Sequence, residues 1–557
     1  MLNQPFILEL DRSQDAPPIY AQIRERLALL IRRGDLPAGT RLPPERQLAD
    51  DLHINRTTVV RAYSDLAAAG LVHAHVGRGT VVQATEQGVA PQRNDQTPGS
   101  TASRAPAAFP WAAYLRESSP PIPGEVGSGG LSPLLQFNRP EFLEGDTVLA
   151  DVVALCSRDD VISLAAGTPD PALYPVEDFL AHLGKQLRND GARLLQHCPI
   201  EGLDSLRGSL ARWLNQRWSE LRQANNQVTP NAPDLEPDHV MILSGSQQGL
   251  WLAARALLAP GETVLVEMPT YLGALRVFAA AGLRVVGVPC DREGMLPEAL
   301  RSALELYRPR LLYLLPTFQN PSGITTSLQR RQAILGLARR YHTPILEDDP
   351  YGELFYQDQP PPPLAALDQS GSVLYLGTCS KVLFPGVRLG WMVAPRPLIA
   401  RLSALRQYID LHANTPSQCA LDGFLREGLF DLHLARSRET YRQKRDLFAD
   451  ALERSSRGLL RWQTPAGGYY LWCVLEGGLR AREVQDEAAK LGVAFVPGYA
   501  FYPGNGGEDH LRLNFTGPAT ETLEEGAKRL GTALERLARK ARRQPQQVTL
   551  TARRPLV

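Results

Sequence analysis

The sequence predicts a multidomain chain, in which a small α+β head precedes a large α/β domain that ends in a smaller α+β lobe. Three observations predict this fold class. Helical segments and a hairpin pattern occupy the chain before residue 84. From Val161 onward, short apolar runs alternate with amphipathic helical stretches, which is typical of a mostly parallel sheet covered on both faces. The 557 residues also exceed what a single ordinary core accommodates.

The head is predicted to contain three helices. The first runs from Ile19 to Arg33, where apolar residues recur at helical spacing until Gly34 interrupts them. A second short helix is expected from about Pro44 to Leu52. Asn55 is well placed to cap a third helix, which extends to Gly70. The residues of this third helix that we expect to face the core are Val59, Val60 and Tyr63.

A hairpin and a polar segment follow the helices. Leu71 to His75 and Thr80 to Gln83 are strand-like, and the hairpin that they form would be the wing of a winged helix-turn-helix. Residues 84–106 are rich in Gln, Thr, Pro, Ser and Asn and almost free of apolar side chains, so burial cannot offset their ordering entropy. We therefore predict a head at 1–83, a flexible linker at 84–106, a large domain at 107–543 and a disordered tail at 544–557. The basic run Arg539 to Arg543, at the end of the large domain, is expected to form a basic terminus together with this tail, either as a solvated, disordered segment or as an accessory DNA contact.

The large domain shows a series of buried-strand patterns separated by helical stretches. The predicted strands are Met241 to Leu243, Thr263 to Glu267, Leu311 to Leu315, Pro344 to Asp348 and Val373 to Leu376. The smaller α+β lobe is expected from Ala451 to Leu537, where strands and helices follow a different rhythm.

Composition excludes several classes of protein. Sixty Lys and Arg residues nearly balance 59 Asp and Glu residues, so any basic surface must be local. The six cysteines are scattered without a CxxC pair and the histidines are not clustered, which argues against a zinc site or a disulfide framework. No basic leader is evident, and no apolar run approaches the ~20 residues of a membrane-spanning helix. We expect a cytoplasmic protein with no metal and no membrane partner.

Positive charge is concentrated in the head, where residues 17–83 carry nine arginines against six acidic residues. A helix that enters the major groove needs polar side chains at its N-terminal end and cations on its flanks for phosphates. The run from Asn55 to Arg61 fits that need, although a solvated basic face is the alternative. The predicted DNA-binding residues are Arg41, Arg46, Asn55, Arg56, Thr57, Thr58, Arg61, His75, Gly77 and Arg78.

The large domain contains candidates for holding an aldehyde cofactor. Such a cofactor needs a lysine, a carboxylate for its ring nitrogen, a donor for its ring oxygen and a phosphate cradle. Lys381 follows an apolar strand and small polar residues, and Arg388 comes soon after. Gly245 to Gln247 join a strand that ends at Leu243 to a helix that is expected to begin near Gly249, and free N–H groups and the helix dipole favour a dianion at that point. Taken singly, Lys381 could be a surface lysine, Asp348 a loop carboxylate and Asn320 part of an ordinary turn.

The head resembles the GntR family of winged-helix regulators. The resemblance rests on Gly39-Thr40-Arg41-Leu42-Pro43-Pro44-Glu45-Arg46, on Asn55-Arg56-Thr57-Thr58-Val59-Val60-Arg61 and on Gly77-Arg78-Gly79-Thr80. Pro44 stands where that family usually carries a serine. This departure changes the predicted helix cap and leaves Arg46 in place.

From about Val161 to Thr516 the chain resembles the fold-type I pyridoxal-phosphate aminotransferases of class I/II. The resemblance implies that Lys381 binds pyridoxal phosphate covalently, that Asp348 faces the pyridine nitrogen, and that Tyr351 is the third catalytic residue. Tyr351 would donate to the ring oxygen together with Asn320, and Tyr271 would stack on the ring, although it could instead be a core tyrosine. Arg512 would hold the substrate α-carboxylate. The phosphate contacts implied are Gly245, Ser246, Gln247, Thr378, Ser380 and Arg388.

The combined layout resembles the MocR subfamily of GntR-type regulators. It implies a homodimer that binds a double-stranded DNA operator and uses pyridoxal phosphate with an amino acid or vitamer as effector. His197 departs from the family pattern, because it stands where relatives generally carry a tyrosine that reaches the partner subunit's phosphate. Two alternatives stay open: an active aminotransferase of the 2-aminoadipate branch that carries a DNA-binding head, and a cofactor-free dimerisation domain, against which Lys381 argues.

Overall fold

The computed structural model describes residues 18–33, 36, 40, 42–52, 54–68, 71–75, 79–82, 108–111, 114, 154–155, 158, 160–227 and 234–543. The chain divides into two compact units: the first contains the residues up to Arg104, and the second starts at Ala105. The predicted linker, 84–106, and the predicted tail, 544–557, lie outside the described residues. Within the described ranges, no helix is long and apolar enough to cross a bilayer.

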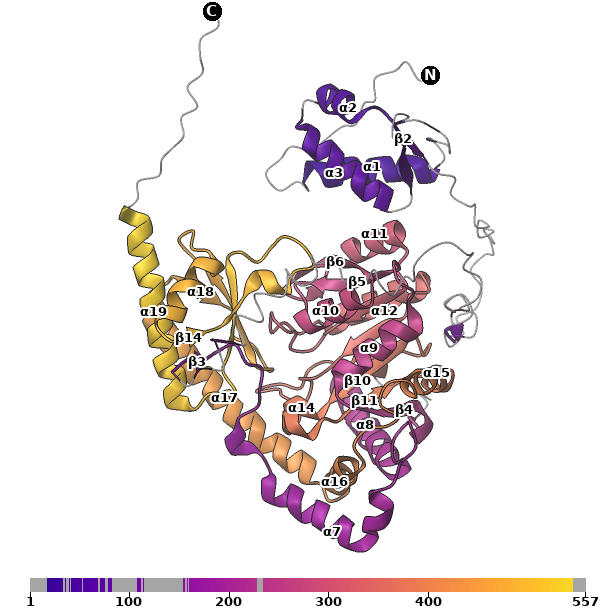
Figure 1. Cartoon of the computed structure of the whole chain (residues 1–557), viewed down its shortest axis with the longest axis vertical. Coiled ribbons are helices and arrows are strands. Elements are labelled where there is room, and N and C mark those ends of the chain that lie inside the picture. The colour runs from indigo at the N-terminus through magenta and orange to yellow at the C-terminus, as the bar shows by residue number, and fades with distance from the viewer. Residues whose placement is uncertain are drawn as a thin grey trace, which may run out of the picture. The chain divides into compact units, whose positions relative to one another are not determined.

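The first unit contains three helices and a hairpin, as predicted (Figure 1). The elements are α1 (Ile19–Arg33), α2 (Glu45–Asp51), α3 (Arg56–Ala68), β1 (Val72–His75) and β2 (Gly79–Val82). The two strands pair antiparallel, with Val72 opposite Val82. Ile23, Leu27 and Leu48 are completely buried between the helices, so this small unit has a core of its own.

Two details of the head differ from or refine the sequence prediction. Val60 is 38% exposed and does not face the core, whereas Val59 and Tyr63 are buried as expected. The reason is helical geometry: consecutive residues are turned by ~100° about the axis, so Val60 leaves the face that Val59 shares with Tyr63. Pro44 occupies the N-cap of α2 without a side-chain cap hydrogen bond. Asn55 does cap α3, since its Oδ1 accepts a 3.0 Å hydrogen bond from the Thr57 amide.

The second unit is built on an eight-stranded sheet of order β4-β11-β10-β9-β8-β5-β6-β7. Its strands are β4 (Val240–Leu243), β5 (Thr263–Met268), β6 (Arg284–Asp291), β7 (Gly294–Met295), β8 (Leu311–Leu314), β9 (Ile345–Asp348), β10 (Val373–Thr378) and β11 (Gly390–Val393). The five predicted strands are present, and β10, β9, β8, β5 and β6 run parallel. The sequence did not predict β11, which runs antiparallel to both β10 and β4.

Helices cover both faces of this sheet (Figure 1). The helices of this part of the chain are α7 (Val176–Leu194), which packs against α16, and α8 (Asp204–Ala224), α9 (Ser246–Leu257), α10 (Leu272–Ala280), α11 (Pro297–Tyr307), α12 (Leu328–Arg340), α13 (Leu364–Leu367), α14 (Cys379–Val382), α15 (Arg396–Arg406) and α16 (Thr415–Arg426). Strand β4 shows why two layers form. Val240 and Ile242 pack in one apolar cluster, while Met241 and Leu243 pack in the other, because side chains alternate across a strand.

The smaller lobe contains an antiparallel sheet of order β12-β13-β16-β15 and a two-stranded pair, β14 with β3. Its elements are β3 (Ile162–Ser163), α17 (Leu429–Ser456), β12 (Leu460–Trp462), β13 (Tyr470–Leu475), α18 (Ala481–Lys490), β14 (Val493–Ala494), β15 (Val496–Pro497), β16 (His510–Asn514) and α19 (Thr520–Arg543). The lobe therefore begins earlier than Ala451 and recruits β3. The basic run Arg539 to Arg543 belongs to α19 rather than to a disordered tail. Leu530 and Leu534 are buried on this helix, which lies beside α17, and Arg and Lys propagate a helix well (Figure 1).

A short aromatic segment docks on the second unit. Phe109, Trp111 and Tyr114 are buried and their rings pack against one another. The Phe109 amide donates to the Ser370 carbonyl at 2.7 Å, and Trp111 Nε1 donates to the Gly371 carbonyl at 2.6 Å. This segment is therefore fixed just before the start of β10.

Candidate functional site

A cavity of about 640 Å³ lies where β9 and β10 end, between the large sheet and the smaller lobe. Polar side chains gather there because the carboxyl ends of parallel strands meet at one edge of a sheet. The predicted site residues that line it are Ser246, Gln247, Tyr271, Asn320, Asp348, Tyr351, Thr378, Ser380, Lys381, Arg388 and Arg512. Gly245 is the N-cap of α9 and comes directly before Ser246 in the sequence. The structure thus brings the predicted cofactor and substrate residues together.

Lys381 lies in the single turn of α14, directly after β10. Its Nζ donates a hydrogen bond to the carbonyl of Gly167. Burial lowers the pKa of Lys381, and nearby Arg512 and Arg388 lower it further, while Tyr470 and Asp348 oppose the shift. A lowered pKa favours the neutral amine, which is the nucleophilic form.

Asp348 ends β9 and is almost completely buried. Its Oδ2 accepts a 2.9 Å hydrogen bond from the Tyr313 hydroxyl, while its buried Oδ1 has no hydrogen-bond partner among the described residues. Burial raises the pKa of Asp348 to about 7, although the Tyr313 hydrogen bond and Lys381 lower it. Asp348 can therefore accept one more N–H donor, and a cationic donor would favour its charged form.

The Gly245 end of the cavity is built for an anion. Gly245 has φ +93°, and a Cβ there would lie 3.0 Å from Arg388 Nη2, so glycine keeps this approach open. Arg388 Nη2 donates to the Ser244 carbonyl at 3.0 Å. The helix α9 begins at Ser246, earlier than predicted, so Gly249 lies in its first turn. Close packing requires glycine at position 249, because a Cβ there would be 2.5 Å from Leu376 Cδ2 on β10.

Thr378 and Ser380 are joined by a local hydrogen bond at the same end of the cavity. The Thr378 side chain caps α14 by accepting from the Ser380 amide at 3.2 Å. Gln247 and Tyr271 form the neighbouring wall, where the Tyr271 hydroxyl contacts Gln247 Oε1 at 3.5 Å. The Tyr271 ring lies against Gly273, since a Cβ on that glycine would be 2.4 Å from the ring. Tyr271 is half-buried and lines the cavity.

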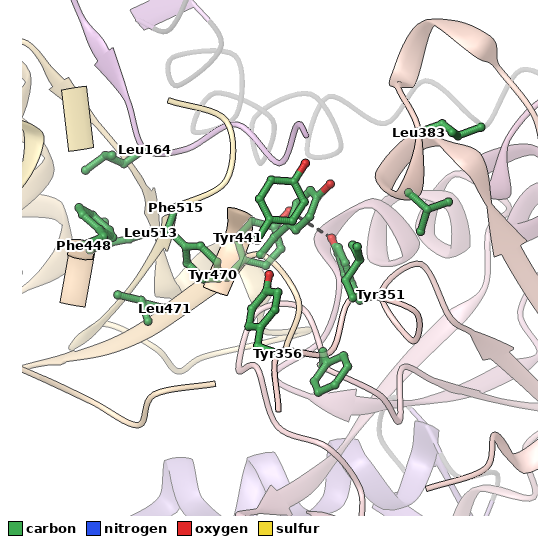
Figure 2. Packing of buried hydrophobic residues seen from close by; sticks show 14 of the residues in the cluster. Leu164, Tyr351, Tyr356, Leu383, Tyr441, Phe448, Tyr470, Leu471, Leu513 and Phe515 are labelled. Carbon is green, nitrogen blue, oxygen red and sulfur yellow. Dashed lines mark hydrogen bonds between the residues drawn. The ribbon is translucent and has the colours of Figure 1, made fainter. Parts of the chain in front are cut away.

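The opposite end of the cavity belongs to Arg512 on β16. Arg512 is buried and donates to Asn320 Oδ1 at 2.9 Å and to the Ala165 carbonyl at 2.7 Å. Its Nε is buried and unpartnered among the residues that the structure describes. The Tyr351 hydroxyl donates to the Tyr470 hydroxyl at 3.2 Å (Figure 2). Asn320 and Tyr351 thus engage other side chains of the cavity.

Sequence reasoning missed four residues of this site: Gly167, Arg276, Tyr313 and Tyr470. Gly167, Arg276 and Tyr470 line the cavity, and Tyr313 supports Asp348 from within β8. Tyr313 and Tyr470 sit in apolar strand patterns, which indicate core positions. Only Gly167, in the small-residue run Ala166-Gly167-Thr168, carried a signal that would have pointed to a close backbone approach.

The predicted DNA-contacting residues of the head lie on or near α3. Arg46, Asn55, Arg56, Thr57 and Arg61 are exposed, and Thr58 is half-buried. Arg56 forms a 3.0 Å ion pair with Glu45, and the Arg61 guanidinium lies 3.9 Å over the Tyr20 ring. The remaining predicted contacts, Arg41, Gly77, Arg78 and the His75 side chain, lie outside the described residues.

His197 is exposed and lies away from the cavity lining. Its Nδ1 lies 3.1 Å from Nε2 of His412, in the segment between α15 and α16. Large apolar side chains near this histidine pair are exposed, namely Leu195, Tyr408, Ile409 and Leu411.

Known proteins match both parts of the chain. Residues 159–530 match the aminotransferase class I and II family, and residues 19–82 match the gntR family of bacterial regulatory proteins. The uncharacterized HTH-type transcriptional regulator YisV of Bacillus subtilis is 32% identical over 93% of this chain and 96% of its own length. The aromatic-amino-acid aminotransferase 1 of Thermococcus litoralis is 37% identical over 70% of this chain and 91% of its own length.

The aminotransferase-like part of the chain is also similar to a solved structure. The alpha-aminoadipate aminotransferase LysN of Thermus thermophilus, complexed with N-(5'-phosphopyridoxyl)-L-leucine, has a TM-score of 0.65 at 34% identity, covering 74% of this chain and 100% of that one. The chain belongs to the class I and II aminotransferase family and carries a GntR-type helix-turn-helix domain at its N-terminal end, which is the architecture of the MocR-type regulators.

Proposed function

We propose that this chain is a DNA-binding transcriptional regulator whose aminotransferase-like domain binds pyridoxal phosphate and an amino acid as effector. The observation that carries the proposal is the donor set around one cavity on a chain that also carries a GntR-type head. Lys381 supplies an amine with a lowered pKa, Asp348 a buried carboxylate oxygen without a partner among the described residues, and Arg388 a cation beside the N-terminus of α9.

These residues fit the cofactor group by group. Bound pyridoxal phosphate would supply an aldehyde for attachment to Lys381 and a ring that stabilises negative charge on the ligand. Asp348 Oδ1 would hold the proton of the ring nitrogen, and Tyr351 would donate to the ring oxygen. Arg388 and the α9 N-terminus would bind the phosphate, with Gly245, Ser246, Gln247, Thr378 and Ser380 completing the cradle. Arg512 would hold an amino acid's carboxylate, since its Nε is still available.

The regulator is proposed to act in the cytoplasm as a homodimer on double-stranded DNA. Two heads related by a two-fold axis suit paired half-sites. Leu195, Tyr408, Ile409 and Leu411 are large exposed apolar side chains in the two segments that the His197–His412 contact joins, and a partner subunit would remove them from water.

An active aminotransferase is the second candidate function. The specific observation in its favour is that lysine, carboxylate and carboxylate-binding arginine are all retained around one cavity. Relatives of the large domain are named for aromatic amino acids and for 2-aminoadipate, and both kinds of ligand carry the α-carboxylate that Arg512 would hold.

Spectroscopy and turnover separate these proposals. The purified chain given pyridoxal phosphate should develop a visible absorption band that Lys381→Ala abolishes and Lys490→Ala retains, since Lys490 is an exposed lysine paired with Glu487. The regulator predicts amino-acid-dependent footprints on operator DNA with little multiple-turnover transfer to a 2-oxo acid. Sustained transfer without any ligand-dependent footprint would favour the enzyme. A colourless wild-type chain would overturn both.

For the head, Arg56→Ala should weaken operator binding about tenfold or more, as loss of a base or phosphate contact does. The ion pair with Glu45 is exposed and worth little, so DNA can replace it. The matched control is Arg26→Ala, an exposed arginine on α1. Equal affinities of the two variants in a gel-shift titration would remove Arg56 from the proposed contacts.

A further inference from the structure

Tyr470 is the first residue of β13 and lines the same cavity as Lys381 and Arg512. It is 3% exposed, and two faces of the side chain make separate contacts. The hydroxyl meets the cofactor-attachment end of the cavity, and the ring meets the carboxylate-binding end. Neither contact belongs to the binding roles proposed for Lys381, Asp348 and Arg388.

The hydroxyl of Tyr470 lies between a phenol and an amine. It contacts the Tyr351 hydroxyl at 3.2 Å, and the two rings meet edge to face at 5.9 Å (Figure 2). A Cβ on Gly167 would lie 2.0 Å from the Tyr470 hydroxyl and 3.5 Å from Lys381 Nζ. Gly167 therefore leaves the space in which the Tyr470 hydroxyl lies beside the amine.

The ring of Tyr470 covers the guanidinium of Arg512. The Arg512 Cζ lies 4.0 Å from the centroid of the Tyr470 ring and 5.0 Å from that of Phe501. Hydrogen bonds to Asn320 and to the Ala165 carbonyl hold the two terminal nitrogens of Arg512. Stacking and hydrogen bonds together fix the plane of the guanidinium and leave Nε as the edge for a further acceptor.

The electrostatics of Tyr470 agree with this placement. Burial alone would raise the pKa of its phenol, but Arg512, Lys381 and the hydrogen bond that Tyr470 accepts from Tyr351 lower it below its ordinary value. Arg512 and Lys381 act on the phenol whichever way that hydrogen bond runs. Because a phenol with a lowered pKa is a stronger hydrogen-bond donor, Tyr470 is also suited to donate.

We propose that Tyr470 is a positioning residue that joins the two ends of the cavity, with its ring orienting Arg512 and its hydroxyl orienting Tyr351. The inference rests on the proposed binding of pyridoxal phosphate. In the structure Tyr351 donates to Tyr470. When Tyr351 instead donates to the ring oxygen of the bound cofactor, the Tyr470 hydroxyl is left to donate to the Tyr351 oxygen. Each hydroxyl carries one proton and accepts a second, so the two donations run in series.

Two substitutions separate the roles of hydroxyl and ring. Tyr470→Phe removes the donor to Tyr351, which weakens the stabilisation of negative charge on the ring oxygen. The pH midpoint of the visible absorption change of the bound cofactor should therefore rise by about half a unit or more. The affinity of Tyr470→Phe for 3-phenylpropanoate, a carboxylate without an amino group, should stay within about twofold of the wild-type value, because the phenyl ring still covers Arg512.

Tyr470→Leu removes the ring as well, and its affinity for 3-phenylpropanoate should fall about fivefold or more. The matched control is Tyr441→Phe, a buried phenol outside the cavity lining that accepts from the Asp170 amide at 3.1 Å. This control should keep both the midpoint and the affinity of the wild type. Circular dichroism establishes that each variant is folded.

An unchanged or lowered midpoint in Tyr470→Phe, with the cofactor bound, would overturn the hydroxyl role. Equal affinity of Tyr470→Leu and the wild type for 3-phenylpropanoate would overturn the ring role. A wild-type chain that takes up no pyridoxal phosphate would instead overturn the proposed function on which the inference rests. These outcomes use spectra and binding constants, so they do not depend on catalytic turnover.

Discussion

Trp111→Ala should release the aromatic segment that docks beside the start of β10. Trp111 is 6% exposed and donates from Nε1 to the Gly371 carbonyl. A buried tryptophan removes about 150–250 Å² from water, which is worth about 4–6 kcal/mol at ~25 cal/mol per Å². Because that area is an upper bound, the expected cost is about 3–5 kcal/mol, in line with large-to-small substitutions in cores.

Hydrogen exchange measures this loss locally. The amides of Phe109, Trp111 and Tyr114 all donate hydrogen bonds within or from the segment. If they are protected by docking, a loss of about 3–5 kcal/mol raises their exchange rate by at least about 100-fold. The control is Trp213→Ala, which removes a partly buried indole whose Nε1 contacts Asp431 at 3.1 Å elsewhere in the same unit. If the segment's exchange rates in Trp111→Ala stay within about threefold of the wild type, the docking energy derived from the burial of Trp111 is refuted.

Two further predictions concern the cavity. Gly245→Ala should weaken pyridoxal phosphate binding about tenfold or more, because φ +93° strains an alanine and its Cβ would meet Arg388 Nη2 at 3.0 Å. The control is Gly261→Ala, which has a similar φ of +90° and nothing within 4 Å of its Cβ, so it isolates the effect of backbone strain. Equal affinities of the two variants for pyridoxal phosphate would contradict the proposed phosphate cradle at Gly245. Asp348 has a pKa raised from 3.8 to about 7, so the folded cofactor-free chain keeps a proton that the unfolded chain has lost. As the pH rises from about 4 to about 7, the free energy of unfolding should therefore fall by at most about 4 kcal/mol because of Asp348. Urea titrations of Asp348→Asn should lack this contribution. An identical pH dependence of stability in the variant and the wild type would disprove the raised pKa of Asp348.

The sequence was sufficient to predict the elements whose pattern is local. The helices of the head and five strands of the large sheet follow from apolar spacing and from turn residues. The predicted cofactor residues also meet in one cavity, because several of them follow directly after strands that end at the same sheet edge. Asp348 ends β9, and Ser380 and Lys381 follow β10.

Other features depend on tertiary packing, which a local pattern does not contain. Tyr470 sits in an apolar strand sequence, and only the fold brings its hydroxyl to Tyr351 from 119 positions away. Val60 looks like its neighbour Val59, yet one faces solvent and the other the core. Gly249 looks like a helix boundary in the sequence, whereas its real constraint is Leu376 on a neighbouring strand.

The two unpartnered polar atoms of the cavity bear on how a ligand could act on such a protein. Asp348 Oδ1 and Arg512 Nε are both buried without a hydrogen-bond partner among the described residues, and they belong to different lobes. Each unsatisfied buried atom costs about 1–3 kcal/mol, and more when the group is charged. A ligand that brought a cationic N–H to Asp348 and a carboxylate to Arg512 would remove both costs at once, about 2–6 kcal/mol. Reversing a two-state equilibrium from 1:99 to 99:1 requires about 5.5 kcal/mol of differential affinity. This gain biases a switch only where the second conformation of the protein holds Asp348 and Arg512 too far apart for one ligand to meet both. Such a switch would depend on Tyr470, which contacts Arg512 at one end of the cavity and Tyr351 at the other.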